Sequence, residues 1–126
     1  MKLPSSSYLK KRLKNLLDEL RRLSVDGCII KESVDLLYLT GLSLSAGSLI
    51  VFRGEMALFV DGRYIQVAQE KSPVPVFLLE EKNIQNFLGD LSFAKIAFDA
   101  TSTSFAEFEK LQKRFKKYEL IPVQVF

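Results

Sequence analysis

The chain of 126 residues contains no histidine and no tryptophan, and it has a single cysteine. Without histidine, the chain cannot form a Ser-His-Asp or Cys-His catalytic site, and it cannot ligate a metal through imidazole. A lone thiol cannot close an internal disulfide, so we expect a reducing, cytoplasmic compartment. Cys28 lies in the apolar run Cys28-Ile29-Ile30 and is expected to be a buried side chain.

Long apolar runs are also missing. The longest uninterrupted ones have about five residues, such as residues 56–60, whereas a helix needs ~20 to cross a bilayer. The N-terminus carries no apolar segment typical of a signal peptide, so no membrane partner is expected. A composition of 48% apolar and 26% charged residues fits one folded domain covering residues 1–126.

The net charge of +3 is unevenly distributed. Residues 1–22 have a local charge of +5, residues 23–109 a local charge of −6, and residues 110–117 add five basic side chains. This pattern describes two basic helices around an acidic middle, which does not favour a nucleic-acid partner.

Apolar spacing predicts helices that alternate with short strands. A first amphipathic helix, with Ser7 as its N-cap, is indicated by leucines three and four residues apart, at 9, 13, 16, 17, 20 and 23. Four more helices are expected: residues 33–39 capped by Ser33, residues 62–71 capped by Asp61, a helix capped by Asn83, and a helix opened by the capping box Ser104–Glu107. In that last helix Phe105 is expected to face inward with Phe108, Leu111 and Phe115.

Six strands are expected at residues 27–31, 49–52, 56–60, 76–79, 96–98 and 119–123. The second and third form a hairpin around Arg53-Gly54-Glu55. Their nearly continuous apolar character indicates a sheet covered by helices on both faces. The fold class is therefore α/β, a three-layer sandwich with a mixed sheet of about six strands.

The segment 40–48 is small and rich in hydroxyl groups, with Gly41 and Gly47 six residues apart. Gly41 suits the end of the preceding helix, where φ is positive. A phosphate-binding loop is excluded because no lysine follows the second glycine. Tyr38, which precedes the loop, could lie in the core or form part of the loop wall, and its leucine neighbours favour the core.

Asp61 and Asp99 both follow predicted strands, at the edge where open α/β sheets bind ligands. Two or three carboxylates there could hold Mg²⁺, but no third convergent carboxylate is found, and aspartate at such positions commonly caps a helix or opens a turn. Asp61 is expected to pair with Arg63. Alternatively, Arg63 contacts a partner subunit or a substrate carboxylate.

Several segments resemble the N-terminal domain of the creatinase/prolidase/aminopeptidase P family. They are Tyr38-Leu39-Thr40-Gly41-Leu42, Ser45-x-Gly47-Ser48-Leu49 and Leu58-Phe59-Val60-Asp61-Gly62-Arg63-Tyr64. In this resemblance Tyr38, Asp61, Gly62 and Tyr64 are motif residues of structural importance. The implied fold is the three-layer, ribonuclease H-like arrangement of that domain.

The resemblance also implies that the domain precedes a catalytic domain of pita-bread fold, which is absent from this chain. That domain binds two divalent metals (Mn²⁺, Co²⁺ or Zn²⁺) through two Asp, one His and two Glu, and it hydrolyses Xaa-Pro peptide bonds. None of those ligands transfers here, so no catalytic or metal-binding residue is expected in this chain. The implied partners are that catalytic domain, further copies in a homo-oligomer, and a proline-containing peptide.

In the family, the N-terminal domain contributes to oligomer contacts and narrows the entrance for substrate. The residues that the resemblance suggests for this task are Thr40, Gly41, Leu42, Ser43, Ser45 and Arg63, although segment 40–48 could equally be a plain surface loop. Two interpretations stay open. The chain is the N-terminal domain of a longer Xaa-Pro aminopeptidase or dipeptidase, or it is a stand-alone, non-catalytic interaction module of the same fold that binds protein or nucleic acid.

Overall fold

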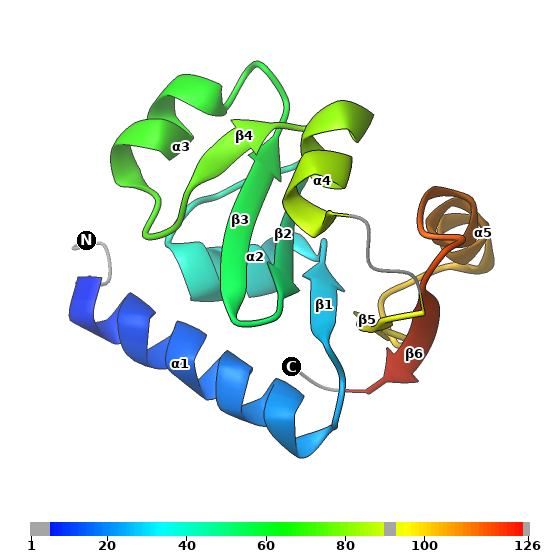
Figure 1. Cartoon of the computed structure of the whole chain (residues 1–126). Helices are drawn as coiled ribbons and strands as arrows, with labels where there is room; N and C mark the ends of the chain where they lie inside the picture. The colour runs from blue at the N-terminus through cyan, green and yellow to red at the C-terminus, as the bar shows by residue number, and fades with distance from the viewer. Residues whose placement is uncertain (1–5, 90–92, 125–126) are drawn as a thin grey trace.

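A computed structural model describes residues 6–89 and 93–124 of the chain. Helices and strands alternate in the predicted order (Figure 1), with these bounds: α1 Ser6–Arg22, β1 Gly27–Ile30, α2 Ser33–Thr40, β2 Gly47–Phe52, β3 Glu55–Val60, α3 Ile65–Lys71, β4 Val76–Leu78, α4 Glu81–Leu88, β5 Lys95–Asp99, α5 Phe105–Arg114 and β6 Glu119–Val123. The strands form one sheet in the order β4-β3-β2-β1-β5-β6. The mixed six-stranded α/β fold expected from the sequence is confirmed.

Only β2 runs against its neighbours. It pairs antiparallel with β1 and β3, whereas the pairs β1–β5, β5–β6 and β3–β4 are parallel. The carboxyl ends of the other five strands therefore meet at one edge, and the segment that leads into β2 lies at that same edge. This is the edge at which open α/β sheets form ligand sites.

Side chains alternate between two cores, one on each face of the sheet. In β2, Leu49 and Val51 join leucines of α1 and α2, whereas Ile50 and Phe52 join residues of α4 and α5. The strand is buried at every position, so its apolar character is continuous rather than alternating. Helices α1, α2 and α3 cover one face and α4 and α5 the other, which confirms the three layers.

The hairpin between β2 and β3 turns on two residues, one fewer than the predicted connection. Arg53 has φ 52° and Gly54 has φ 84°, and two positive values match the twist of a tight antiparallel hairpin. Gly27, at the start of β1, has a different role, because a Cβ atom there would lie 2.0 Å from the carbonyl oxygen of Val51. The close approach of β1 to β2 thus requires glycine.

Four predicted helix caps are wrong. Helix α1 begins at Ser6, so Ser7 lies inside its first turn. The residues that precede α2 and α4 are Glu32 and Glu80, which place Ser33 and Asn83 within the helices. Helix α3 begins only at Ile65, after a turn that contains Asp61.

The capping box of α5 is confirmed, since the Ser104 hydroxyl accepts from the Glu107 N–H and the Glu107 carboxylate accepts from the Ser104 N–H. Phe105 is a correction, because its side chain is 76% exposed rather than inward. It occupies the first position of α5, ahead of Phe108 and Leu111, the residues through which this helix packs against the sheet.

Cys28 is fully buried, as expected, and burial raises the pKa of its thiol. Within the described ranges, none of the helices is long and apolar enough to span a lipid bilayer.

Candidate functional site at the carboxyl edge of the sheet

The Thr40-Gly41 pair closes helix α2. The Thr40 side chain is 1% exposed; its hydroxyl donates to the Leu36 carbonyl at 2.6 Å and accepts from the Leu42 N–H at 3.2 Å. Gly41 adopts φ 76° and donates its N–H to the Leu37 carbonyl, the left-handed helix end expected of it. These residues fix the direction in which the chain leaves α2, and the Thr40 side chain presents no surface to a ligand.

Beyond Gly41, the loop before β2 alternates between buried and exposed side chains. Leu42 and Leu44 are buried in the core beneath α1 and α2, whereas Ser43 and Ser45 are exposed. The polar surface that segment 40–48 offers therefore consists chiefly of two hydroxyl groups. Burial of the leucines holds those hydroxyls in place.

The sequence Asp61-Gly62-Arg63-Tyr64 forms a tight turn directly after β3. The Asp61 carboxylate accepts from the backbone N–H of Arg63 at 2.9 Å and from its guanidinium Nη2 at 2.9 Å. The side-chain hydrogen bond from Arg63 is the main reason why the pKa of Asp61 lies below its usual value. The predicted ion pair is confirmed, and the Arg63 side chain remains 70% exposed.

One hydrogen bond joins the loop to this turn. The Ser45 hydroxyl lies 2.6 Å from the Tyr64 hydroxyl, although the two residues are 19 apart in sequence. The Tyr64 ring packs against the core on the α1 and α2 side of the sheet. Ser43, Ser45 and Arg63 consequently belong to one exposed polar surface at the carboxyl edge, which we call the edge surface.

Tyr38 is a correction to the prediction of a core side chain. Its side chain is 54% exposed, and the Arg12 guanidinium lies 4.1 Å from the centre of its ring. Arg12 also donates from Nη1 to the Tyr38 carbonyl at 2.8 Å. The stacked pair joins α1 to α2, and sequence reasoning missed it because it links positions 26 apart in the chain.

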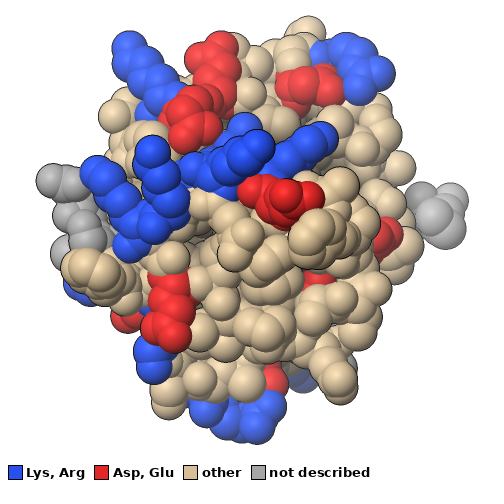
Figure 2. Space-filling model, turned by 90° about the vertical axis from the view of Figure 1, so that its right-hand side faces the viewer, with Lys and Arg blue, Asp and Glu red and all other residues tan. Residues whose placement is uncertain are grey.

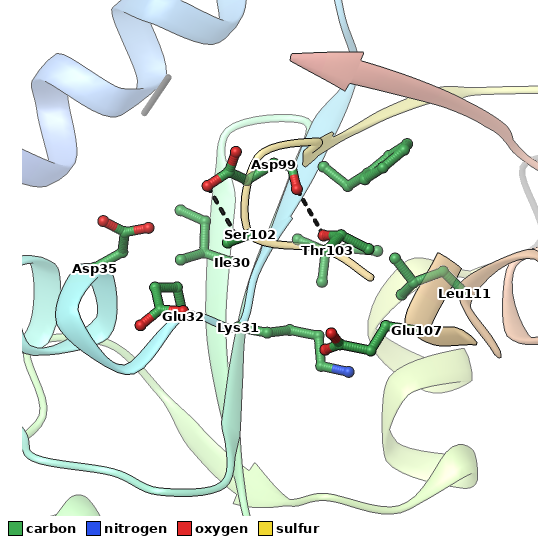
Figure 3. Close-up of a pocket in the computed structure, with 11 residues that line it drawn as sticks. Ile30, Lys31, Glu32, Asp35, Asp99, Ser102, Thr103, Glu107 and Leu111 are labelled. Atoms are coloured by element: carbon green, nitrogen blue, oxygen red, sulfur yellow. Dashed lines mark hydrogen bonds between the residues drawn. The ribbon is translucent and has the colours of Figure 1, made fainter. Parts of the chain in front are cut away.

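A second feature of the edge is a small hollow between the ends of β1 and β5, with a volume of about 60 Å³. Asp35 of α2 and Asp99 of β5 both line this hollow (Figure 3). Burial, followed by the nearby charges of Asp99 and Glu32, raises the pKa of Asp35. Partial burial alone would raise the pKa of Asp99, but hydrogen bonds from Thr101 and Ser102 outweigh it and lower that pKa.

The structure does not bring Asp61 and Asp99 together. Asp61 follows β3 and Asp99 ends β5. These strands are separated by β2 and β1, and three strand spacings amount to roughly 14 Å. Each carboxylate is instead hydrogen-bonded within its own turn. The geometry therefore disfavours a shared Mg²⁺ site of the nuclease type.

In residues 6–89 and 93–124, no group of three or more His, Cys, Asp or Glu side chains could hold a metal ion. These residues therefore offer no ligand set that fits the two divalent metals implied by the family resemblance. No metal-dependent step is assigned to them.

Comparison with known proteins gives one family and a set of structural relatives. The N-terminal, creatinase/prolidase-like domain of a Corynebacterium diphtheriae protein superposes with a TM-score of 0.81 at 24% identity, covering 95% of this chain and 98% of that one. The aminopeptidase P of Streptococcus thermophilus gives a TM-score of 0.79 at 22% identity, with 92% of each chain covered. The X-Pro aminopeptidase of Thermotoga maritima gives 0.77 at 17% identity, where 88% of this chain covers 33% of that one.

These likenesses show that the fold is shared. A comparison with the sequences of curated proteins finds no match. The sequence model of the creatinase/prolidase N-terminal domain, however, matches residues 12–125, which is nearly the whole chain. This chain therefore belongs to the creatinase/prolidase N-terminal domain family.

Proposed function

We propose that this chain is the non-catalytic N-terminal domain of a proline-specific, dinuclear metallopeptidase, an Xaa-Pro aminopeptidase or dipeptidase. Its task is to shape the entrance to an active site housed in a separate catalytic domain, and to make contacts between subunits. Two divalent metals would be bound by that catalytic domain. The buried lone cysteine agrees with a reducing, cytoplasmic setting.

The observation that carries this proposal is the edge surface. Ser43 and Ser45 present hydroxyl groups on a loop anchored by buried leucines, and the bond between Ser45 and Tyr64 holds that loop beside Arg63. Small polar side chains on a fixed loop can line an entrance without blocking it, and they narrow it only for larger substrates. A rigid scaffold with exposed polar loop residues is the usual arrangement for selective access.

Arg63 gives the edge surface its charge. The bonds to Asp61 use Nε and Nη2 of the guanidinium, so Nη1 is available to a carboxylate of a peptide or of a neighbouring subunit. Asp61 holds the guanidinium in one orientation. That orientation reduces the entropy lost when a second carboxylate binds.

The first test is the reading frame of the gene that encodes this chain. The reading frame should continue beyond codon 126 into a segment that supplies two Asp, one His and two Glu as metal ligands. A frame that stops at this codon would contradict the proposal and favour a stand-alone module.

The protein encoded by the complete frame then tests the entrance. Ser43→Trp should lower kcat/KM for long Xaa-Pro peptides several-fold more than for an Xaa-Pro dipeptide, because a bulky side chain obstructs only the longer substrate. Gln112→Trp, on the exposed side of α5, is the matched control and should change neither value. Equal effects of Ser43→Trp on both substrates would refute the entrance role.

A further inference from the structure

A strongly basic groove lies along the seam between α4 and α5, on the face of the sheet opposite α1, and reaches Lys31 at the carboxyl end of β1. Two hollows with volumes of about 450 and 370 Å³ share Glu81, Lys113 and Arg114 among their lining residues, so they adjoin each other along this seam. We call it the basic groove; its charged lining comprises Lys31, Lys110, Lys113, Arg114, Lys116 and Lys117, with Glu81. Figure 2, which faces this side of the molecule, shows a band of Lys and Arg side chains with acidic groups at its margins.

Among the described residues, the charge of the basic groove is unevenly balanced. Apart from Lys117, five basic side chains line it together with one carboxylate, that of Glu81, which forms an ion pair with Arg114 at 3.0 Å. Just outside, Glu107 lies close enough to Lys31 and Lys110 for their charges to contribute to its lowered pKa, after the hydrogen bonds from Ser104. Lys31 also shares the neighbouring hollow with Glu32, Asp35 and Asp99, so the excess of positive charge lies chiefly at residues 110–116.

Stabilisation of helix α5 explains only some of the basic side chains in the groove. Lys113 and Arg114 occupy the last turn of α5, where cations interact favourably with the helix dipole. Lys31 follows β1, and Lys116 lies beyond the end of α5, so neither belongs to that turn. Because like charges held together repel one another, an anionic occupant would be favoured.

We propose that the basic groove binds an extended, acidic segment of a protein partner. Helix α5 has ten residues and is about 15 Å long, which an extended segment of about five residues would span. Alternate carboxylates on such a segment would meet the basic side chains along α5. Surface charges of this kind chiefly set the association rate and the choice of partner.

The lining favours a polypeptide over a nucleic acid or a membrane. Tyr118 is the aromatic residue that lines the groove, and its half-buried ring packs edge-on against Phe52 and Phe115, so no exposed ring is offered for base stacking. Leu111, the apolar lining residue, is buried and cannot insert into lipid. A concave groove also suits a strand-like ligand better than a flat lipid surface.

The experiment measures binding to the full 126-residue chain by fluorescence anisotropy, with fluorescein-labelled hexaglutamate as the probe. Labelled hexaglutamine, labelled hexathymidine DNA and phosphatidylserine vesicles are the comparison ligands. The variant Lys113→Glu/Lys116→Glu reverses two charges in the groove. Lys10→Glu/Lys14→Glu makes the same change of net charge on α1, which covers the opposite face of the sheet.

The proposal predicts that hexaglutamate binds and hexaglutamine does not, with weaker binding at about 0.15 M salt, where the screening length is about 8 Å. Reversal in the groove should weaken binding roughly tenfold, and reversal on α1 by less than about twofold. The neutral variant Lys113→Gln/Lys116→Gln should weaken it by an intermediate factor, with circular dichroism spectra unchanged.

Three results would overturn the proposal: no binding of hexaglutamate at low salt, equal weakening by the two charge reversals, or tighter binding of the DNA or the vesicles than of the peptide. None of these readouts depends on peptidase activity. The proposal therefore stands or falls separately from the entrance role.

Discussion

Replacing Thr40 by valine tests whether the Thr-Gly motif has the structural role that its buried hydrogen bonds indicate. Valine has nearly the size of threonine, so the core around position 40 keeps its packing. The substitution removes the hydroxyl that donates to the Leu36 carbonyl and accepts from the Leu42 N–H. Because this position is buried, the Leu42 N–H would lose its partner where water has little access.

The size of the effect follows from that lost partner. A buried donor left without an acceptor costs about 1–3 kcal/mol, so we expect Thr40→Val to lower the free energy of unfolding by about 2 kcal/mol. Thr40→Ser is the matched control, since it keeps the hydroxyl and loses one methyl group, at about 1 kcal/mol. The valine variant should therefore be the less stable of the two, although valine is the more apolar residue.

Urea denaturation, followed by circular dichroism, measures the difference. With a typical dependence of 1–3 kcal/mol per molar urea, the midpoint should fall by about 1 M for Thr40→Val and by less for Thr40→Ser. A valine variant as stable as the parent chain, or more stable than the serine variant, would refute the reasoning.

Three other substitutions or conditions give expected outcomes. Gly27→Ala should lower stability by about 3 kcal/mol in thermal denaturation, because its Cβ would collide with a backbone carbonyl of β2, whereas Gly62→Ala, with nothing within 4 Å, should be neutral. Ser104→Ala should cost about 1 kcal/mol through loss of the hydroxyl that accepts from the Glu107 N–H. The pKa of Glu107 is lowered first by the backbone N–H of Ser104, which alanine keeps, so the stability that this carboxylate contributes above about pH 4.5 and loses in acid should remain largely in the variant, and its urea midpoint should lie below that of the parent in neutral solution and in acid alike. The Cys28 thiol, buried and with a raised pKa, should resist iodoacetamide in the folded chain and react after unfolding in urea; rapid labelling of the native protein would contradict its burial.

The leucine pattern of α1 and the capping box of α5 could be predicted because both depend on residues within one or two helical turns. Leu9, Leu13, Leu16 and Leu20 are all buried, as their spacing requires. The starts of α2 and α4 were harder to predict. The first N–H groups of a helix can bond to water, so a polar side chain such as Ser33 or Asn83 does not fix where the helix begins.

Tyr38 shows where reasoning from neighbours in the sequence fails. Leu36, Leu39 and Thr40 are the buried residues of α2. The helical period therefore places Tyr38 on the outer side of this helix, next to Arg12 of α1. The bond between Ser45 and Tyr64 lies beyond local patterns altogether, because it depends on how β2 and β3 pair. The edge surface could thus be suggested by residue type, but its geometry required the fold.

The central claim is that this domain shapes access to chemistry that another domain performs. Hydrolysis of an Xaa-Pro dipeptide by the purified 126-residue chain, measured with added Mn²⁺, Co²⁺ or Zn²⁺, tests it most directly. The account predicts no turnover above the buffer blank with any of the three metals. Measurable turnover that a chelator abolishes would contradict the account.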